Sequence, residues 1–219
     1  MSIHSTRDIV GDKFQQETFL EAREICQKII KEFSTTIPVN TRADDIKSEL
    51  EKVFQAAGLK KFWHPTKIRI AQDTMKTFRA ENDSSLTTSE NEIFFIDCGP
   101  IYENHEADYG ETFRLNSKMV CPLMKGCKEV FNFTAALWRE QKLSGADLYN
   151  KASQYSAQLG FELNPLMAGH RIGDFPHQLY GQGKMAEMDY SPSSGLWVLE
   201  IHLIDLATQR GAFFEDVLI

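Results

Sequence analysis

The sequence predicts an α+β fold, and two features of its pattern lead to this prediction. Helical and strand-like patterns follow one another in the order helix, helix, strands, and the same order then occurs a second time. No stretch between the two sets has the composition of a linker. We therefore expect one domain over residues 1–219, built from two similar halves, with a flexible N-terminal segment over residues 1–12.

Composition limits the functions that the chain can have. The net charge of −7 argues against nucleic acid or an anionic membrane surface as a partner, because either would attract a basic face. The N-terminus lacks the apolar core of a secretory signal, and no run approaches the ~20 apolar residues that cross a bilayer. We expect a cytoplasmic protein. Its four cysteines form no CxxC pair and are expected to be buried free thiols: Cys26, Cys98, Cys121 and Cys127.

Two amphipathic helices are expected in the first half. Apolar residues recur at three- and four-residue steps over residues 13–34, and Pro38 then breaks the pattern. A second helix is expected to begin after Thr41, whose hydroxyl would cap it, and to end near Gly58.

The first half then continues into strands. Polar and apolar residues alternate over residues 66–71, which is typical of a strand, and a polar surface loop is expected over residues 80–91. Strands are also expected over residues 92–98 and 107–115. Because only a short segment joins these two strands, we expect them to form an antiparallel pair.

The second half repeats this order. A long amphipathic helix is expected over residues 118–140, and Ser144 is expected to cap another helix that runs to Gly160. The rest of the chain is expected to form short strands and loops. The expected strands cover residues 169–172, 195–203 and 211–217.

Acidic side chains occur in apolar, strand-like segments where such residues are unexpected. Asp97, Glu200 and Glu215 each follow three or four apolar residues, and Asp108 lies near the start of the strand after Asp97. Burying unpaired carboxylates is costly, so each needs a cation. Three of these segments contain neither Lys nor Arg: residues 94–102, 196–201 and 212–214. Bound divalent metal ions would supply the charge; for any single residue, the alternative is an exposed acid at a strand end.

These acids stand in an arrangement that resembles the pita-bread metallopeptidases, the family of methionine aminopeptidase, aminopeptidase P, prolidase and the metal-free creatinase. FIDCG at residues 95–99 and ADYGETF at residues 107–113 resemble the paired-aspartate hairpin of that family. GHRIG at residues 169–173, followed by His177, resembles its GHGIG…H motif. The resemblance covers residues 18–219.

The resemblance implies a fold of two αβ halves around a curved antiparallel sheet, with two divalent metal ions at its centre. It implies that Asp97 chelates one metal ion, that Asp108 and Glu215 bridge both, and that His170 and Glu200 complete the second site. A set of carboxylates with one imidazole suits Mn, Fe or Co, and Zn is an alternative.

Two residues are candidates for catalysis. Two metal ions that share a water would lower its pKa and polarise a carbonyl. Glu200 is the candidate that carries the proton from the water to the leaving amine. His177 would donate a hydrogen bond to the tetrahedral intermediate; the alternative is a loop histidine packed beside Phe175 and Pro176.

Departures from the family pattern concern residues that would bind the substrate. Phe78 stands where the family has a histidine that helps to hold the scissile peptide. His64 is a candidate substitute, and the alternative is a structural histidine where a loop becomes a strand. Arg171 replaces a small residue inside the GHGIG-like motif, where it could pair with Asp174 or contact a substrate carboxylate.

The sequence therefore favours a dinuclear metal-dependent hydrolase that cleaves a peptide or the amide of a small molecule. The alternative is a binding protein that has kept the fold and the metal ligands without turnover. A third interpretation is metal-free C–N hydrolysis as in creatinase, and retention of all the ligands argues against it. The resemblance allows a homodimer, and no nucleic-acid or membrane partner is expected.

Overall fold

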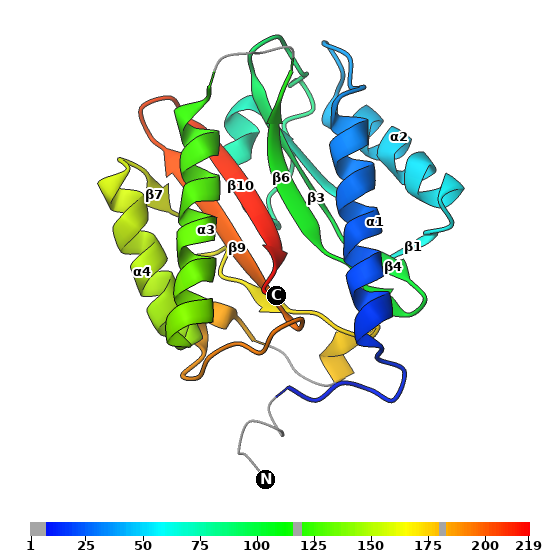
Figure 1. Ribbon diagram of the computed structural model, residues 1–219. Helices are drawn as coiled ribbons and strands as arrows, with labels where there is room; N and C mark the ends of the chain where they lie inside the picture. The colour runs from blue at the N-terminus through cyan, green and yellow to red at the C-terminus, as the bar shows by residue number, and fades with distance from the viewer. Residues whose placement is uncertain (1–7, 116–119, 180–182) are drawn as a thin grey trace.

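The structure is a computed structural model that describes residues 8–115, 120–179 and 183–219. Four long helices cover one face of a curved antiparallel sheet, with α1 and α2 beside one half of the sheet and α3 and α4 beside the other (Figure 1). The helices are α1 (Gln16–Ser34), α2 (Ala43–Ala56), α3 (Pro122–Gln141) and α4 (Gly145–Gln158). This arrangement confirms the α+β fold and the repeated order of helices and strands.

The main sheet has seven strands in the order β2-β3-β6-β10-β9-β7, and β8 also pairs with β9. Its strands are β2 (Lys67–Ile70), β3 (Ile93–Cys98), β6 (Tyr109–Arg114), β7 (Glu162–Leu163), β8 (His170–Arg171), β9 (Trp197–Asp205) and β10 (Arg210–Val217). The predicted antiparallel pair is confirmed as β3 and β6. The two halves meet where β6 pairs with β10, with Phe214 opposite Glu111 and Glu215 opposite Gly110.

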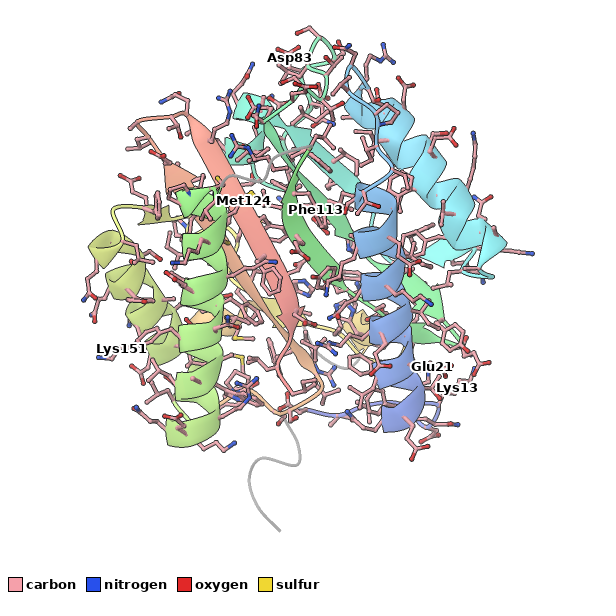
Figure 2. All side chains as sticks on the ribbon, turned by 45° about the horizontal axis from the view of Figure 1, so that its top comes forward. Lys13, Glu21, Asp83, Phe113, Met124 and Lys151 are labelled. Carbon is pink, nitrogen blue, oxygen red and sulfur yellow. The ribbon has the colours of Figure 1, made fainter. Side chains whose placement is uncertain are left out.

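Each half has its own hydrophobic core between its helices and its strands. Phe19, Ala22, Cys26 and Ile30 recur at three- and four-residue steps and form the buried stripe of α1, as the periodicity predicts. Charged residues such as Glu21 on α1 and Lys151 on α4 are exposed on the opposite faces (Figure 2). Phe214 packs against both cores at their junction. Among the residues that the structure describes, no helix is long and apolar enough to span a membrane.

A second, smaller sheet was not expected from the sequence. Its strands are β1 (Lys61–Phe62), β4 (Pro100–Tyr102) and β5 (His105–Glu106). The segment expected only to connect β3 with β6 thus forms a hairpin of its own, which turns at Glu103 and Asn104 with positive φ angles of 44° and 63°. The amide of Trp63 donates a hydrogen bond to Gly99 O at 2.9 Å, which holds the loop after β1 against the end of β3.

One of the two predicted helix caps is present. Ser144 precedes α4, and its hydroxyl accepts a hydrogen bond from the amide of Asp147 at 3.1 Å, as predicted. The predicted cap at Thr41 is wrong, because its hydroxyl donates to Pro38 O at 2.8 Å. Arg42 is the residue that precedes α2, and its side chain makes no capping hydrogen bond.

Other predicted boundaries differ by a few residues. The strand expected over residues 66–71 ends at Ile70, because Ala71 has a positive φ of 55° and begins the short 3-10 helix η2 (Ala71–Met75). The helix expected over residues 118–140 begins at Pro122, a residue favoured in the first helical turn; residues 118–119 lie outside the described part of the chain. Cys121 is half-buried, whereas the other three cysteines are buried as predicted, and all four are free.

The described part of the N-terminal segment lies against the loops of the second half. Trp197 Nε1 donates to Asp8 Oδ1 at 3.0 Å, and the amide of Gly11 donates to Asp174 Oδ1 at 3.0 Å. Residues 1–7 of the segment that the sequence predicts to be flexible lie outside the described residues.

Candidate metal centre

Four adjacent strands place three of the candidate ligands in one row. Asp97 on β3 pairs with Gly110 on β6, Gly110 pairs with Glu215 on β10, and Glu215 pairs with Glu200 on β9. Residues that are paired across neighbouring strands point to the same face of a sheet. The three carboxylates therefore share one face, although they are up to 118 residues apart in the sequence (215 − 97 from the residue numbers for Asp97 and Glu215).

Gly110 leaves space within this row. A Cβ atom at Gly110 would lie 2.7 Å from Glu215 Oε1 and 2.4 Å from Phe213 Cε1, closer than real Cβ atoms come to other atoms. A side chain at this position would thus displace the carboxylate of Glu215. Residue 110 must therefore be a glycine, because the Glu215 carboxylate, in the middle of the row, comes so close to it.

Asp108 and His170 complete the predicted ligand set. His170 Nε2 lies 2.9 Å from Asp108 Oδ2 and 4.0 Å from Glu200 Oε1. One ligand atom each from Asp108, His170 and Glu215 lies within 4.8 Å of the other two. The other oxygen of Glu200, Oε2, accepts a hydrogen bond from the amide of Gly169 at 2.7 Å, which fixes the orientation of this carboxylate.

The electrostatics of this cluster favour a bound cation. Burial, and then repulsion by Asp108, Asp97 and Glu200, raises the pKa of Glu215 well above its ordinary value. Burial also raises the pKa of Asp97 to about 7. Glu215 Oε1 is buried and has no hydrogen-bond partner among the described residues. Divalent cations bind such oxygen atoms and would neutralise the carboxylates, so the residues present fit a metal centre.

His64 lies directly against the same carboxylates. Its Nε2 atom is 3.2 Å from Asp108 Oδ1 and 3.6 Å from Asp97 Oδ1. Although burial alone would lower it, the charge of Asp97 and the hydrogen bond with Asp108 raise the pKa of His64 to about 9. The imidazole packs edge-on against the rings of Trp63 and Phe78, with ring centroids 4.3 and 5.6 Å away.

All the candidate site residues border one cavity of about 370 Å³ on this face of the sheet. The cavity is bordered by the five predicted metal ligands and by His64, Phe78, Arg171 and His177. Trp63, Leu166 and Met167 add apolar surface. A space of this volume is large enough for a small peptide or amide.

Arg171 contacts the N-terminal segment. Its Nη2 atom donates a hydrogen bond to Ile9 O, and Asp174 accepts one from Gly11 instead. No ion pair between Arg171 and Asp174 occurs among the described residues, so the predicted pairing with Asp174 is wrong. The N-terminal segment contacts both side chains instead: Ile9 O accepts from Arg171, which is 2% exposed, and Asp174 accepts from the amide of Gly11.

Glu106 is a functional candidate that the sequence analysis missed. This residue is fully buried, and its Oε2 atom lies 2.6 Å from His177 Nδ1. Its two oxygens also accept hydrogen bonds from the amides of His177 and Gly173, at 3.1 and 3.2 Å. Glu106 does not lie in a run of apolar residues as the predicted acids do, because His105 and Ala107 flank it. In the sequence, its position two residues before Asp108 is what marks it as a candidate.

Comparisons with known proteins agree with this architecture. The sequence matches Metallopeptidase family M24 over residues 17–218, and no curated protein matches it. An X-Pro aminopeptidase from Thermotoga maritima is a similar solved structure, with a TM-score of 0.75 and 17% identity over 97% of this chain and 60% of that one. A prolidase from Pyrococcus horikoshii has a TM-score of 0.74 and 17% identity over 96% of this chain and 60% of that one.

A methionine aminopeptidase from Thermotoga maritima differs from these in length. It has a TM-score of 0.73 and 14% identity, and the match covers 97% of this chain and 94% of that one. The chain thus spans about 60% of the length of the aminopeptidase and the prolidase, and nearly all of the methionine aminopeptidase. At these identities the likeness shows the fold, which is the pita-bread fold that the sequence predicts.

Proposed function

The chain belongs to metallopeptidase family M24, and from this premise we propose that it is a hydrolase with a dinuclear metal centre. Its substrate is a peptide or the amide of a small molecule. The metal ligands are Asp97, Asp108, His170, Glu200 and Glu215. The protein acts in a reducing compartment, for which its four free cysteines are suited, and we place it in the cytoplasm.

One observation carries this proposal. The row of Asp97, Glu215 and Glu200 across four paired strands gathers buried carboxylates around an oxygen atom, Glu215 Oε1, that has no hydrogen-bond partner among the described residues. Without a cation, such a cluster costs several kcal/mol in repulsion and lost hydration. A fold that keeps the cluster needs a compensating gain, and metal binding supplies one.

Bound divalent cations would polarise the scissile carbonyl and lower the pKa of the attacking water. We propose that Glu200 moves the proton. Its Oε2 atom is held by the amide of Gly169, so Oε1 on the cavity side is left to receive the proton of the water and pass it to the leaving amine. Carboxylate and imidazole donors favour Mn, Fe or Co, and Zn is also compatible.

His177 is suited to stabilise the developing negative charge on the carbonyl oxygen. The Glu106 carboxylate accepts the hydrogen bond of Nδ1 and directs Nε2 of His177 to the cavity, where it can contact the carbonyl oxygen of the substrate. Trp63 and Phe78 restrict access of bulk water from the side of His64.

Phe78 supports a second candidate function. A phenylalanine cannot donate the hydrogen bond with which a histidine would hold a scissile peptide. Phe78 instead packs edge-on against His64. The ammonium group of Lys67 lies over the Phe78 ring, 4.6 Å from the ring centroid. A protein that binds metal and a ligand without turnover would tolerate this change.

Metal content and turnover test the two functions. Wild-type protein purified without chelator is expected to hold two equivalents of Mn, Fe or Co by elemental analysis, and Asp108→Ala is expected to lose them. Asp205→Ala is the matched control, because Asp205 lies at the exposed turn between β9 and β10. Wild-type protein that holds no metal and takes up neither Mn²⁺ nor Co²⁺ would refute the dinuclear centre.

The metal-loaded protein is then tested on a panel of X-Pro dipeptides, N-terminal methionyl peptides and simple aminoacyl amides. Hydrolysis that disappears in Glu200→Gln, with the metal content and the circular dichroism spectrum largely kept, supports the hydrolase. Absence of turnover with Mn²⁺, Fe²⁺, Co²⁺ and Zn²⁺ on the whole panel favours the binding function.

A further inference from the structure

We infer that His64 is a sixth protein ligand of the metal centre, on the side of Asp97. This inference rests on the proposed function and concerns which atoms hold one of its two metal ions. The set that the family resemblance implies contains a single imidazole, that of His170. In this chain a second imidazole faces the other half of the cluster.

The carboxylate of Asp108 lies between the imidazoles of His64 and His170. Its Oδ1 atom lies 3.2 Å from His64 Nε2, and its Oδ2 atom lies 2.9 Å from His170 Nε2. Each oxygen of the bridging carboxylate thus has one imidazole nitrogen beside it. A carboxylate that bridges two metal ions presents one oxygen to each ion, so this arrangement gives each ion its own imidazole.

The distances match those between ligand atoms around one ion. Nitrogen and oxygen ligands lie about 2.0–2.2 Å from the metal, so neighbouring ligand atoms are roughly 3–3.5 Å apart. His64 Nε2 is 3.2 Å from Asp108 Oδ1 and 3.6 Å from Asp97 Oδ1. Ligand atoms of these three residues all lie within 4.8 Å of one another.

The second nitrogen of each imidazole is already used. His64 Nδ1 lies 3.1 Å from Pro65 O, and His170 Nδ1 lies 3.1 Å from Arg171 O. In both residues an Nδ1–H that donates to the carbonyl of the next residue would leave the lone pair of Nε2 for a metal ion in place of the hydrogen that it shares with Asp108. Histidine ligands of metals are commonly held in this way by a backbone carbonyl.

The local fold fixes His64 in this position. Its side chain is 9% exposed and packs between Trp63 and Phe78. A Cβ at Gly99 would lie 2.3 Å from His64 Cδ2 and 2.4 Å from His64 Nε2, so the glycine that follows Cys98 is what permits the close approach. Phe78 therefore forms a wall for His64, and a histidine at residue 78 is not needed to complete the coordination.

Proton NMR of the Co²⁺-loaded full-length protein tests the inference. A histidine ligand of Co²⁺ has a strongly shifted Nδ1–H signal that disappears in D₂O. Wild-type protein is expected to show two such signals, one each from His64 and His170. His64→Gln is expected to remove one signal and to weaken one of the two Co²⁺ sites by about tenfold or more in a titration. His170→Gln removes the other signal.

His105→Gln is the control, since His105 is buried but contacts Gln15 and Glu103 outside the cavity, and it is expected to leave both signals. If the wild type bound two Co²⁺ ions but showed only one shifted signal, His64 would not be a ligand, whereas the proposed dinuclear centre would still be supported. Loss of turnover in His64→Gln with unchanged Co²⁺ affinity and signals would assign it to the substrate instead. Failure of the wild type to bind Co²⁺ would refute both proposals.

X-ray absorption of the wild-type protein decides the question even if the His64→Gln chain does not fold. An average of one imidazole per Co²⁺ agrees with two histidine ligands on two ions. An average of one imidazole per two ions contradicts the role of His64.

Discussion

Glu106, which is fully buried, holds the imidazole of His177 by its Nδ1 atom, 2.6 Å from Glu106 Oε2. The carboxylate also accepts hydrogen bonds from the amides of Gly173 and His177. Three hydrogen bonds thus fix both the carboxylate and the ring that it orients. In such a pair the acid sets which ring nitrogen of the histidine faces the cavity.

Glu106→Gln is expected to lower kcat/KM of the hydrolase by about 10²-fold or more while the metal content stays at the wild-type value. The glutamine amide has the size of the carboxylate but can present either its oxygen or its NH₂ group to Nδ1, so it no longer fixes which ring nitrogen of His177 faces the cavity. Nitrogen NMR of the ring follows the proton on Nδ1 directly, independently of any substrate.

Glu103→Gln provides the matched control, because Glu103 is exposed at the turn between β4 and β5. Its activity and the His177 ring signals are expected to equal those of the wild type. An unchanged ring spectrum in Glu106→Gln would show that the carboxylate does not set the protonation of His177.

Removing one carboxylate from the cluster is expected to have opposite consequences with and without metal. Burial and neighbouring carboxylates raise the pKa of Glu215, so the metal-free protein gains from losing this charge. Metal-free Glu215→Gln is therefore expected to melt no lower than metal-free wild type. Mn²⁺ at about 100 times its Kd is expected to raise the Tm of the wild type by roughly 5–10 °C and that of Glu215→Gln by much less.

Thermal melting with and without a chelator measures both effects. Glu162→Gln, at an exposed residue of β7, is expected to keep the full increase in Tm with Mn²⁺. A Glu215→Gln protein that melts far below the wild type in chelator would mean that Glu215 stabilises the fold without metal.

The four free thiols are expected to differ in reactivity. Burial raises the pKa of Cys26, Cys98 and Cys127, which keeps each as a thiol. Cys127 Sγ also donates to Ile201 O at 3.3 Å. Cys121 is half-buried at the start of α3. An aromatic disulfide reagent at about pH 8 is expected to modify one thiol rapidly in the folded chain and all four after unfolding.

Cys121→Ser is expected to remove the rapid phase. A second rapidly reacting thiol in that variant would show that one of the cores opens on the timescale of the reaction.

Most of the acidic cluster could be predicted because its members carry a local signal. Asp97, Glu200 and Glu215 interrupt apolar segments, and burial of an unpaired charge is unfavourable wherever it occurs. The two halves were predictable because amphipathic helices and alternating strands have short-range periods. The junction between the two halves could not be predicted, because the pairing of Glu215 with Gly110 joins residues 105 positions apart (215 − 110) and depends on the complete sheet.

Glu106 and the cap of α2 could not be predicted for a related reason. Nothing near Glu106 in the sequence is apolar enough to indicate burial, and its partner His177 comes from a distant loop. Thr41 has the residue type of a cap, yet its hydroxyl donates to Pro38 O instead, because the chain turns back there. For Glu106 a contact between distant residues decides its burial, and for Thr41 the turn back to Pro38 decides which acceptor the hydroxyl finds.

Gly99→Ala is expected to disturb the proposed metal centre without replacing any of its ligands. A Cβ there would lie 2.3 Å from His64 Cδ2 and 2.3 Å from Trp63 Nε1, and neither ring can move freely. Trp63 Nε1 donates to Ala107 O at 2.9 Å, next to Asp108, so the displacement would reach the carboxylate of Asp108. Overpacking of this kind costs about 1–3 kcal/mol in the free energy of unfolding.

Denaturant unfolding and Co²⁺ titration measure the two consequences of this substitution. We expect Gly99→Ala to lose stability, and its Co²⁺ affinity to fall because His64 moves away from Asp97 and Asp108. Gly173→Ala is the matched control: a Cβ there would meet nothing within 4 Å, so the free energy of unfolding is expected to stay close to that of the wild type. If Gly99→Ala bound Co²⁺ as tightly as the wild type, the contact between Gly99 and His64 would not matter for metal binding.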